Sequence, residues 1–83
     1  MTDRTAEPIL FFTRRGCPLC DKALALLQPV ADRYGLTVDE VDVDLDLALL
    51  ERYDHRVPVI MYAGKVVAEG IVTADDLDGG FVR

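Results

Sequence analysis

The sequence contains no tryptophan, a single histidine and few basic side chains, and it has no long hydrophobic run. Its 9 basic residues against 15 acidic ones give a net charge of −6, so it lacks the basic face that nucleic acids and anionic membranes require. No apolar stretch approaches the roughly 18 residues of a membrane-spanning helix. The segment Met1–Leu10 lacks the apolar region of a signal peptide. We therefore expect a cytoplasmic protein that binds neither nucleic acid nor membrane.

The length of the chain limits it to one small domain. We expect that domain to span residues 1–83, with a packed core over about residues 8–77, and to be a monomer. A hydrophobic fraction of 51% is ordinary for a globular protein and argues against intrinsic disorder. A domain of this size has no room for a large cleft, which argues against a hydrolase built around one.

Hydrophobic spacing predicts an α/β fold with four strands and three helices. We expect strands over residues 8–13, 37–43, 57–62 and 65–69, and helices over residues 18–34, about 45–53 and from Thr73 onward. Pro29 is expected to kink the first helix or to end its regular part. Thr73 and Asp76 have the spacing of a capping box at the start of the last helix. The order βαβ, α, ββ, α favours a mixed four-stranded sheet flanked by helices, with a right-handed crossover in the first unit.

The second predicted helix is short and rich in leucine. Leu47, Leu50 and Leu49 are expected to face the core from this helix. Leu45 is expected to continue the apolar face that Val41 and Val43 begin on the preceding strand.

The two cysteines, Cys17 and Cys20, are three positions apart. A disulfide between them closes a ring of about 4 residues, which the chain-entropy model credits with about 2 kcal/mol against about 3 kcal/mol for a 15-residue loop. Such a bridge stabilises a fold little. Cysteine spacing of this kind beside a βαβ unit is typical of a redox motif in a cytosolic protein.

The chemistry of this motif follows from its place at the start of a helix. The nucleophile in disulfide exchange is the thiolate, and a free cysteine with a pKa of about 8.5 is only about 3% ionised at pH 7. Cys17 is placed to receive stabilisation from the helix N-terminus and from the nearby Arg14 and Arg15. Cys20 lies one turn further along, on the apolar face, where burial keeps a thiol protonated. We expect Cys17 to attack a disulfide and Cys20 to resolve the mixed disulfide.

Other interpretations of these residues remain open from the sequence. The cysteines can form half of a zinc site, for which His55 is the only further nitrogen or sulfur ligand. His55 itself, between Asp54 and Arg56, is interpreted as a solvated loop residue. Arg14 and Arg15 can equally be exposed loop charges.

Pro58 interrupts an apolar strand pattern. It can stand at the first or second residue of the strand, or it can follow a cis Val57–Pro58 bond. A cis bond would direct the Val57 backbone outward, where it can pair with an extended peptide or thiol.

The chain resembles the glutaredoxin family over about residues 8–77. The resemblance is closest to small bacterial glutaredoxin-like proteins of unassigned role. It is carried by the Cys-Pro-Leu-Cys motif together with a Val-Pro pair about forty residues downstream, and by four segments, namely residues 17–21, 40–44, 50–53 and 56–59. It implies a thioredoxin-like fold with sheet order 2-1-3-4 and with cis-Pro58 facing the cysteines.

The resemblance also implies roles in substrate binding. Arg14 occupies the position of a basic residue that helps hold the glycine carboxylate of glutathione, and Val57 the position that pairs by its backbone with the glutathione cysteine. Gly70 matches the first glycine of a pair that precedes the γ-glutamyl site. The sequence departs from the pattern here, because Ile71 replaces the second glycine.

We therefore expect a thiol–disulfide oxidoreductase with Cys17 and Cys20 catalytic, and with Arg14, Val57, Pro58 and Gly70 binding substrate. No cofactor or metal is required. Protein or low-molecular-weight disulfides are the expected partners, with glutathione as a candidate co-substrate and a thioredoxin-reductase-like enzyme as another candidate reductant. The alternatives are a binding module that holds a metal or a 2Fe–2S cluster between two chains, and a redox-inert adaptor.

Overall fold

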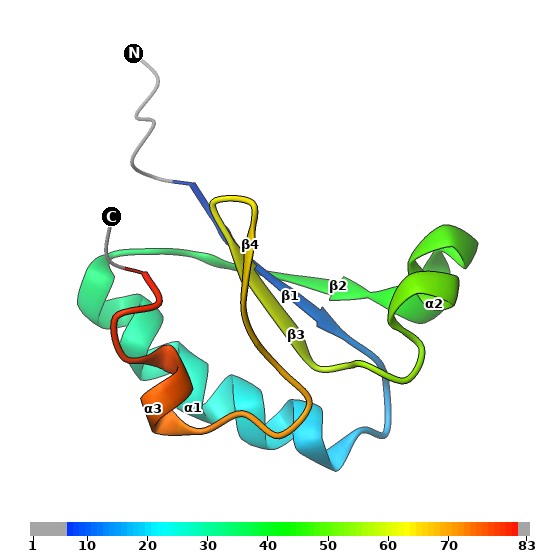
Figure 1. Ribbon diagram of the computed structural model, residues 1–83, viewed down its shortest axis with the longest axis horizontal. Helices are drawn as coiled ribbons and strands as arrows, with labels where there is room; N and C mark the ends of the chain where they lie inside the picture. Colours follow the sequence, from blue (N-terminus) through cyan, green and yellow to red (C-terminus); the bar gives the residue numbers. More distant parts are fainter. Residues whose placement is uncertain (1–6, 82–83) are drawn as a thin grey trace.

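A computed structural model of the protein describes residues 7–81 and shows a twisted sheet with helices on both faces (Figure 1). Residues 1–6 and 82–83 lie outside the described residues, and with them most of the N-terminal segment considered above and both ends of the expected domain. Within residues 7–81, no helix combines the length and the hydrophobicity needed to cross a bilayer.

The sheet has the order β2-β1-β3-β4, as predicted. Its strands are β1 (Ile9–Thr13), β2 (Val38–Asp42), β3 (Val59–Tyr62) and β4 (Lys65–Glu69). The helices are α1 (Pro18–Tyr34), α2 (Leu47–Tyr53) and α3 (Ala74–Leu77), and a 3₁₀ turn, η2, covers Val43–Leu45. β1 pairs with β2 in parallel, and β1–β3 and β3–β4 are antiparallel. The carboxyl ends of β1 and β2 therefore meet at one end of the sheet.

Two hydrophobic clusters cover the two faces of the sheet. Phe11 belongs to the cluster beneath α1 and α3, which also includes Leu27 and Leu77. Phe12, the next residue of β1, belongs to the cluster beneath α2, where its ring stacks on Tyr53 with centroids 4.6 Å apart. The alternation of strand side chains thus distributes one apolar run between both faces, which is why the first four residues of β1 are all hydrophobic.

Helix α1 has the predicted bounds, and its ends have clear causes. Cys17 is the N-cap residue, and Pro18 occupies the first turn, where its missing N–H costs nothing. Gly35 ends the helix with φ of 67°, a left-handed conformation in which its N–H bonds back to helix carbonyls. Pro29 does not end the helix, which continues to Tyr34. The N-terminal end of α1 therefore positions the sulfur atoms of Cys17 and Cys20.

The segment after β2 differs from the prediction. The strand ends at Asp42, one residue early, because η2 turns the chain, and α2 begins at Leu47 with the Asp46 carboxylate as its cap. Leu45 is 85% exposed and Leu47 is 73% exposed, so their predicted inward positions are wrong. The 3₁₀ turn breaks the alternation after the buried Val43 and rotates both leucines outward.

Leu49 and Leu50 pack against the cluster beneath α2, as predicted.

Strand β3 begins at Val59 rather than at residue 57, since Pro58 has no N–H to donate to a neighbouring strand. The hairpin to β4 turns at Ala63 and Gly64, which both have positive φ, as a two-residue hairpin turn requires. Thr73 and Asp76 form the predicted capping box at the start of α3.

Strands β2 and β4 are the edges of the sheet. β2 carries three acidic side chains in five residues, namely Asp39, Glu40 and Asp42. Asp39 and Glu40 are exposed.

Candidate active site at the start of α1

A disulfide joins Cys17 and Cys20 at the first turn of α1, with their Cα atoms 5.2 Å apart. The backbone N–H of Cys20 donates a hydrogen bond to the Cys17 sulfur over 3.1 Å. Cys17 Sγ therefore occupies the place of a capping oxygen, next to N–H groups that have no partner within the helix. This is the position at which a negative charge on sulfur is stabilised most.

The sequence before the helix delivers Cys17 to this position. β1 ends at Thr13, and the loop of Arg14, Arg15 and Gly16 turns the chain away from the sheet. Gly16 has φ of 67°, which a side chain would disfavour.

The two cysteines differ in exposure. Cys17 is half-buried, whereas Cys20 is only 2% exposed and belongs to the cluster beneath α1 and α3. Solvent and substrates therefore reach the first sulfur more easily than the second. A buried thiol is held in its neutral form, so the two positions favour different protonation states once the disulfide is reduced.

The Val57–Pro58 peptide bond is cis, as the resemblance implied. Pro58 is fully buried, and its carbonyl oxygen accepts a hydrogen bond from Gly70 N–H over 2.9 Å. Val57 packs against the same cluster as Cys17. Its N–H donates to the Tyr53 carbonyl over 3.2 Å, and its own carbonyl oxygen accepts no hydrogen bond from the described residues.

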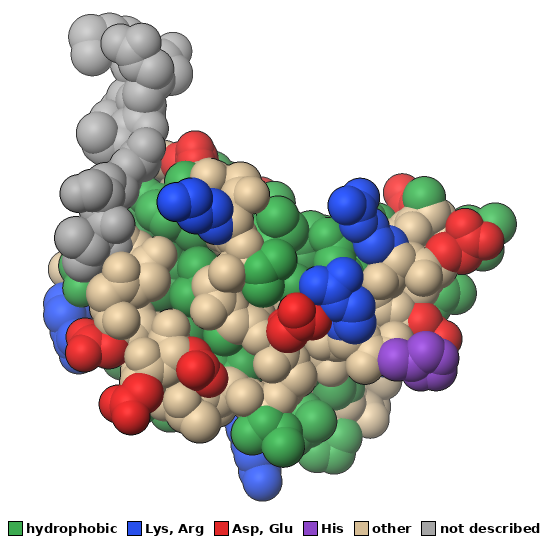
Figure 2. All heavy atoms as spheres, viewed as in Figure 1, with side chains coloured by type: hydrophobic (Ala, Val, Ile, Leu, Met, Phe, Trp, Pro, Cys, Tyr) green, Lys and Arg blue, Asp and Glu red, His purple; other side chains and the backbone are tan. Residues whose placement is uncertain are grey.

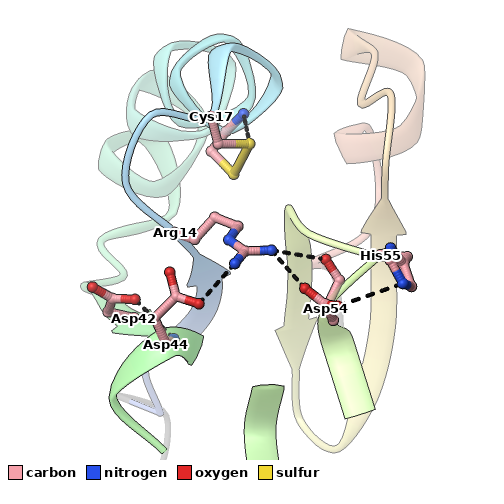
Figure 3. Close-up of polar contacts among 7 residues, drawn as sticks. Arg14, Cys17, Asp42, Asp44, Asp54 and His55 are labelled. Carbon is pink, nitrogen blue, oxygen red and sulfur yellow. Dashed lines mark hydrogen bonds and ion pairs between the residues drawn. A yellow bond between two sulfur atoms is a disulfide. The ribbon is translucent and has the colours of Figure 1, made fainter. Parts of the chain in front are cut away.

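Arg14 is held by two carboxylates from distant segments (Figure 3). One terminal nitrogen contacts Asp54 Oδ1 at 2.6 Å and the Asp54 carbonyl at 3.3 Å, and the other contacts Asp44 Oδ1 at 2.8 Å. The hydrogen bond to Asp54, and then the charge of Asp44, raise the pKa of Arg14 above its ordinary value. The guanidinium thus joins the loop that carries Cys17 to η2 and to the end of α2.

A second arginine secures the other side of the Val57–Pro58 segment. Arg56 contacts both carboxylate oxygens of Glu69, at 2.8 Å and 3.0 Å, and lies 5.3 Å from the centre of the Tyr53 ring. The hydrogen bond from Arg56 lowers the pKa of Glu69, and the same bond raises the pKa of Arg56. Residues 54–58 are therefore tied to the Cys17 loop through Asp54 and to β4 through Arg56.

Hydrophobic side chains line the edge near the disulfide. Figure 2 shows such side chains along the lower edge, where the start of α1 and the β4–α3 loop lie. The large exposed hydrophobic residues of these two segments are Leu19, 41% exposed, and Ile71, 76% exposed.

The structure brings several predicted site residues together. Cys17 and Cys20 are bonded, Val57 packs against the same hydrophobic cluster as Cys17, and the Gly70 N–H bonds to the Pro58 carbonyl. The roles assigned to Arg14, Val57, Pro58 and Gly70 in binding substrate stay predictions.

The sequence analysis missed the partners of the two arginines. Asp44 and Asp54 are 30 and 40 residues from Arg14, and Glu69 is 13 from Arg56. No local sequence spacing indicates such pairs.

The His55 side chain is 94% exposed, and its Nε2 lies 3.4 Å from Asp54 Oδ2. This exposure confirms its interpretation as a solvated loop residue. In residues 7–81, no three side chains of His, Cys, Asp or Glu gather where they could hold a metal ion.

Comparison with known proteins gives consistent matches. Residues 8–79 match the family model of the glutaredoxin-like domain (DUF836). A glutaredoxin-like protein of Dictyostelium discoideum is 29% identical over 75 residues, which cover 83% of this chain and 69% of the relative. The crystal structure of a structural genomics target protein from X. campestris is 31% identical, with a TM-score of 0.70 over 83% of this chain and 88% of that one. Oxidised mitochondrial thioredoxin 3 from Saccharomyces cerevisiae is 17% identical, covers 94% and 78% of the two chains, and has a TM-score of 0.65, which shows a shared thioredoxin fold.

Proposed function

The chain belongs to the glutaredoxin-like family, and from this premise we propose that it is a thiol–disulfide oxidoreductase. Cys17 is the attacking cysteine and Cys20 the resolving one. The observation that carries the proposal is their placement: Cys17 caps α1 and is half-buried, whereas Cys20 is 2% exposed within bonding distance of it.

The exchange proceeds in two steps. In the reduced protein, the Cys17 thiolate attacks one sulfur of a substrate disulfide, forms a mixed disulfide and releases the other substrate sulfur as a thiolate, which takes up a proton. Cys20 then loses its proton and attacks the Cys17 sulfur, which releases the second substrate thiol and forms the Cys17–Cys20 disulfide. Two electrons pass from the two cysteines to the substrate.

The start of α1 supports the first step, because the Cys20 N–H already points at the Cys17 sulfur over 3.1 Å. This donor stabilises the Cys17 thiolate before it attacks the substrate disulfide. The second step is short, since the Cα atoms of the two cysteines are 5.2 Å apart.

The Val57–Pro58 segment is the proposed docking site. The Val57 carbonyl oxygen accepts no hydrogen bond from the described residues, and the Val57 side chain packs against the same hydrophobic cluster as Cys17. An extended substrate with an N–H near its disulfide can donate to that oxygen. The Gly70 N–H holds this segment in place by donating a hydrogen bond to the Pro58 carbonyl oxygen.

The substrates are proposed to be protein or low-molecular-weight disulfides. Glutathione and a thioredoxin-reductase-like enzyme are the two candidate reductants that return the cysteines to thiols, and the reaction needs no other cofactor. We place the protein, as a monomer, in the cytoplasm, where such reductants keep thiols reduced.

The test is the variant Cys20→Ser, because it should stop the reaction at the mixed disulfide. Incubated with a small neutral disulfide, this variant should gain one substrate thiol on Cys17, detected by mass spectrometry. The matched variant Cys17→Ser should gain little, since Cys20 is buried. The absence of an adduct in Cys20→Ser contradicts the proposal, and a colour or bound metal in protein purified without oxygen would favour the metal-binding alternative.

A further inference from the structure

Arg14 is the predicted anion-binding residue of the site, and its two partners change what it can bind. We propose that Asp44 and Asp54, by occupying Arg14, make the site select against disulfides that carry carboxylates, glutathione among them, and in favour of disulfides with uncharged or apolar flanks. The proposal rests on the proposed function and names the substrate class of that same site.

The first argument is the geometry of the guanidinium. Arg14 makes three hydrogen bonds, two to Asp54 and one to Asp44, and both of its terminal nitrogens are engaged. Both carboxylates reach it within 2.8 Å, from elements on either side of the Cys17 loop. Figure 3 shows Asp44 on one side of the guanidinium and Asp54 on the other. A substrate carboxylate has to displace one of these partners to obtain a bidentate contact.

The second argument is charge. One guanidinium and two carboxylates leave this cluster with a net negative charge, so a third carboxylate approaches it against repulsion. The three side chains are between 34% and 39% exposed, so an incoming molecule can approach their charges. Arg15, the other cation of the loop, is exposed and forms no ion pair among the described residues. A lone exposed arginine attracts an anion only weakly.

Two exposed hydrophobic side chains, at the start of α1 and in the β4–α3 loop, also bear on the choice of substrate. Gly70 bonds to Pro58, and the residue after it, Ile71, is 76% exposed. Leu19, between the cysteines, is also exposed. These side chains offer apolar contact rather than hydrogen-bond donors to whatever flanks the substrate disulfide. Of the two candidate reductants, this surface favours the thioredoxin-reductase-like enzyme over glutathione.

The experiment compares three small disulfides with the reduced protein. Oxidised glutathione is an anion, cystamine is a cation and bis(2-hydroxyethyl) disulfide is neutral. Rates of Cys17–Cys20 oxidation are followed by acid quench and mass spectrometry at low ionic strength. The key variant is Asp44→Asn with Asp54→Asn, which keeps the shape of both side chains and removes their charge.

We expect the double variant to oxidise about fivefold faster with oxidised glutathione, because two negative charges are removed from the cluster around Arg14. Its rate with cystamine should fall, and its rate with the neutral disulfide should stay within about twofold. Adding Arg14→Gln should remove part of the gain with glutathione, because the cluster then carries no charge instead of a positive one. If the double variant does not fold, Asp44→Asn alone should give a smaller gain of the same sign.

The control is Asp32→Asn with Asp39→Asn, which changes the total charge equally. Both residues are exposed, Asp32 near the far end of α1 and Asp39 near the start of β2. The inference is overturned if the control matches the gain, or if the Asp44 and Asp54 variants leave the glutathione rate unchanged or lower it. A protein that reacts with none of the three disulfides refutes the proposed function itself, a different outcome.

Discussion

The ionisation of Cys17 offers the most direct test of the site. In the reduced Cys20→Ser variant, Cys17 is the single thiol, and the backbone N–H that points at its sulfur is unchanged. We expect its pKa to lie well below that of a free cysteine, about 8.5. The cause is the position of its sulfur at the cap of a 17-residue helix.

The magnitude follows from the contacts. A helix N-terminus stabilises a negative charge by about 0.3–1 kcal/mol. One N–H donor to a charged acceptor adds about 1.5–3 kcal/mol. The exposed Asp21 carboxylate in the first turn opposes both effects, although solvent screens it. A net stabilisation of about 2 kcal/mol raises the ionisation constant about 30-fold. Arg14 adds no stabilisation to this sum, because its pairs with Asp44 and Asp54 leave the cluster with a net negative charge.

The assay is the rate of alkylation by iodoacetamide as a function of pH, read by mass spectrometry. Cys17→Ser is the matched control, because it leaves the buried Cys20, whose pKa should be raised by burial. The reasoning is refuted if the two thiols titrate together near the value of a free cysteine. It is also refuted in part if Arg14→Gln raises the pKa of Cys17 by a full unit, since that would show an arginine charge that its carboxylates do not cancel.

Three further predictions concern stability and are measured by urea unfolding. Because the hydrogen bond from Arg56 lowers the pKa of Glu69, that pair stabilises the fold at neutral pH and stops doing so as the pH falls through the lowered pKa. The wild type should therefore lose more stability than Glu69→Gln between about pH 6 and about pH 3, and equal losses would count against the pair. Leu27→Ala, at a fully buried position, should cost about 2–5 kcal/mol, and a cost below 1 kcal/mol would contradict the packing described. Gly35→Ala should cost about 1–2 kcal/mol, because φ is 67° there, and no change would show that the helix end relaxes.

The sequence predicted the fold closely where a local signal was strong. The bounds of α1 and β4 and the capping box at Thr73 were correct. The sheet order, which the family resemblance implied, was also correct. The largest errors lie between β2 and α2, where a 3₁₀ turn replaced the continued alternation and exposed Leu45 and Leu47. An alternating pattern of leucine and aspartate fits a strand and a turn equally well, so only tertiary packing could decide.

The candidate site was predictable in its chemistry but not in its charges. The Cys-Pro-Leu-Cys motif carries its own structural context, which placed both sulfur atoms at the start of α1. Arg14 was singled out for its place in sequence, yet its partners come from other elements of the fold. Ion pairs between residues 30 to 40 positions apart leave no periodic trace, so the neutralisation of Arg14 became visible only in three dimensions.

The acidic edge strand β2 has a consequence for how the protein meets copies of itself. An edge strand offers unpaired N–H and C=O groups with which a second sheet can pair. If two copies joined through β2, the Asp39, Glu40 and Asp42 carboxylates of both copies would be brought close together. These carboxylates repel one another at neutral pH. The edge strand β2 therefore opposes the pairing of sheets from different copies into a fibre.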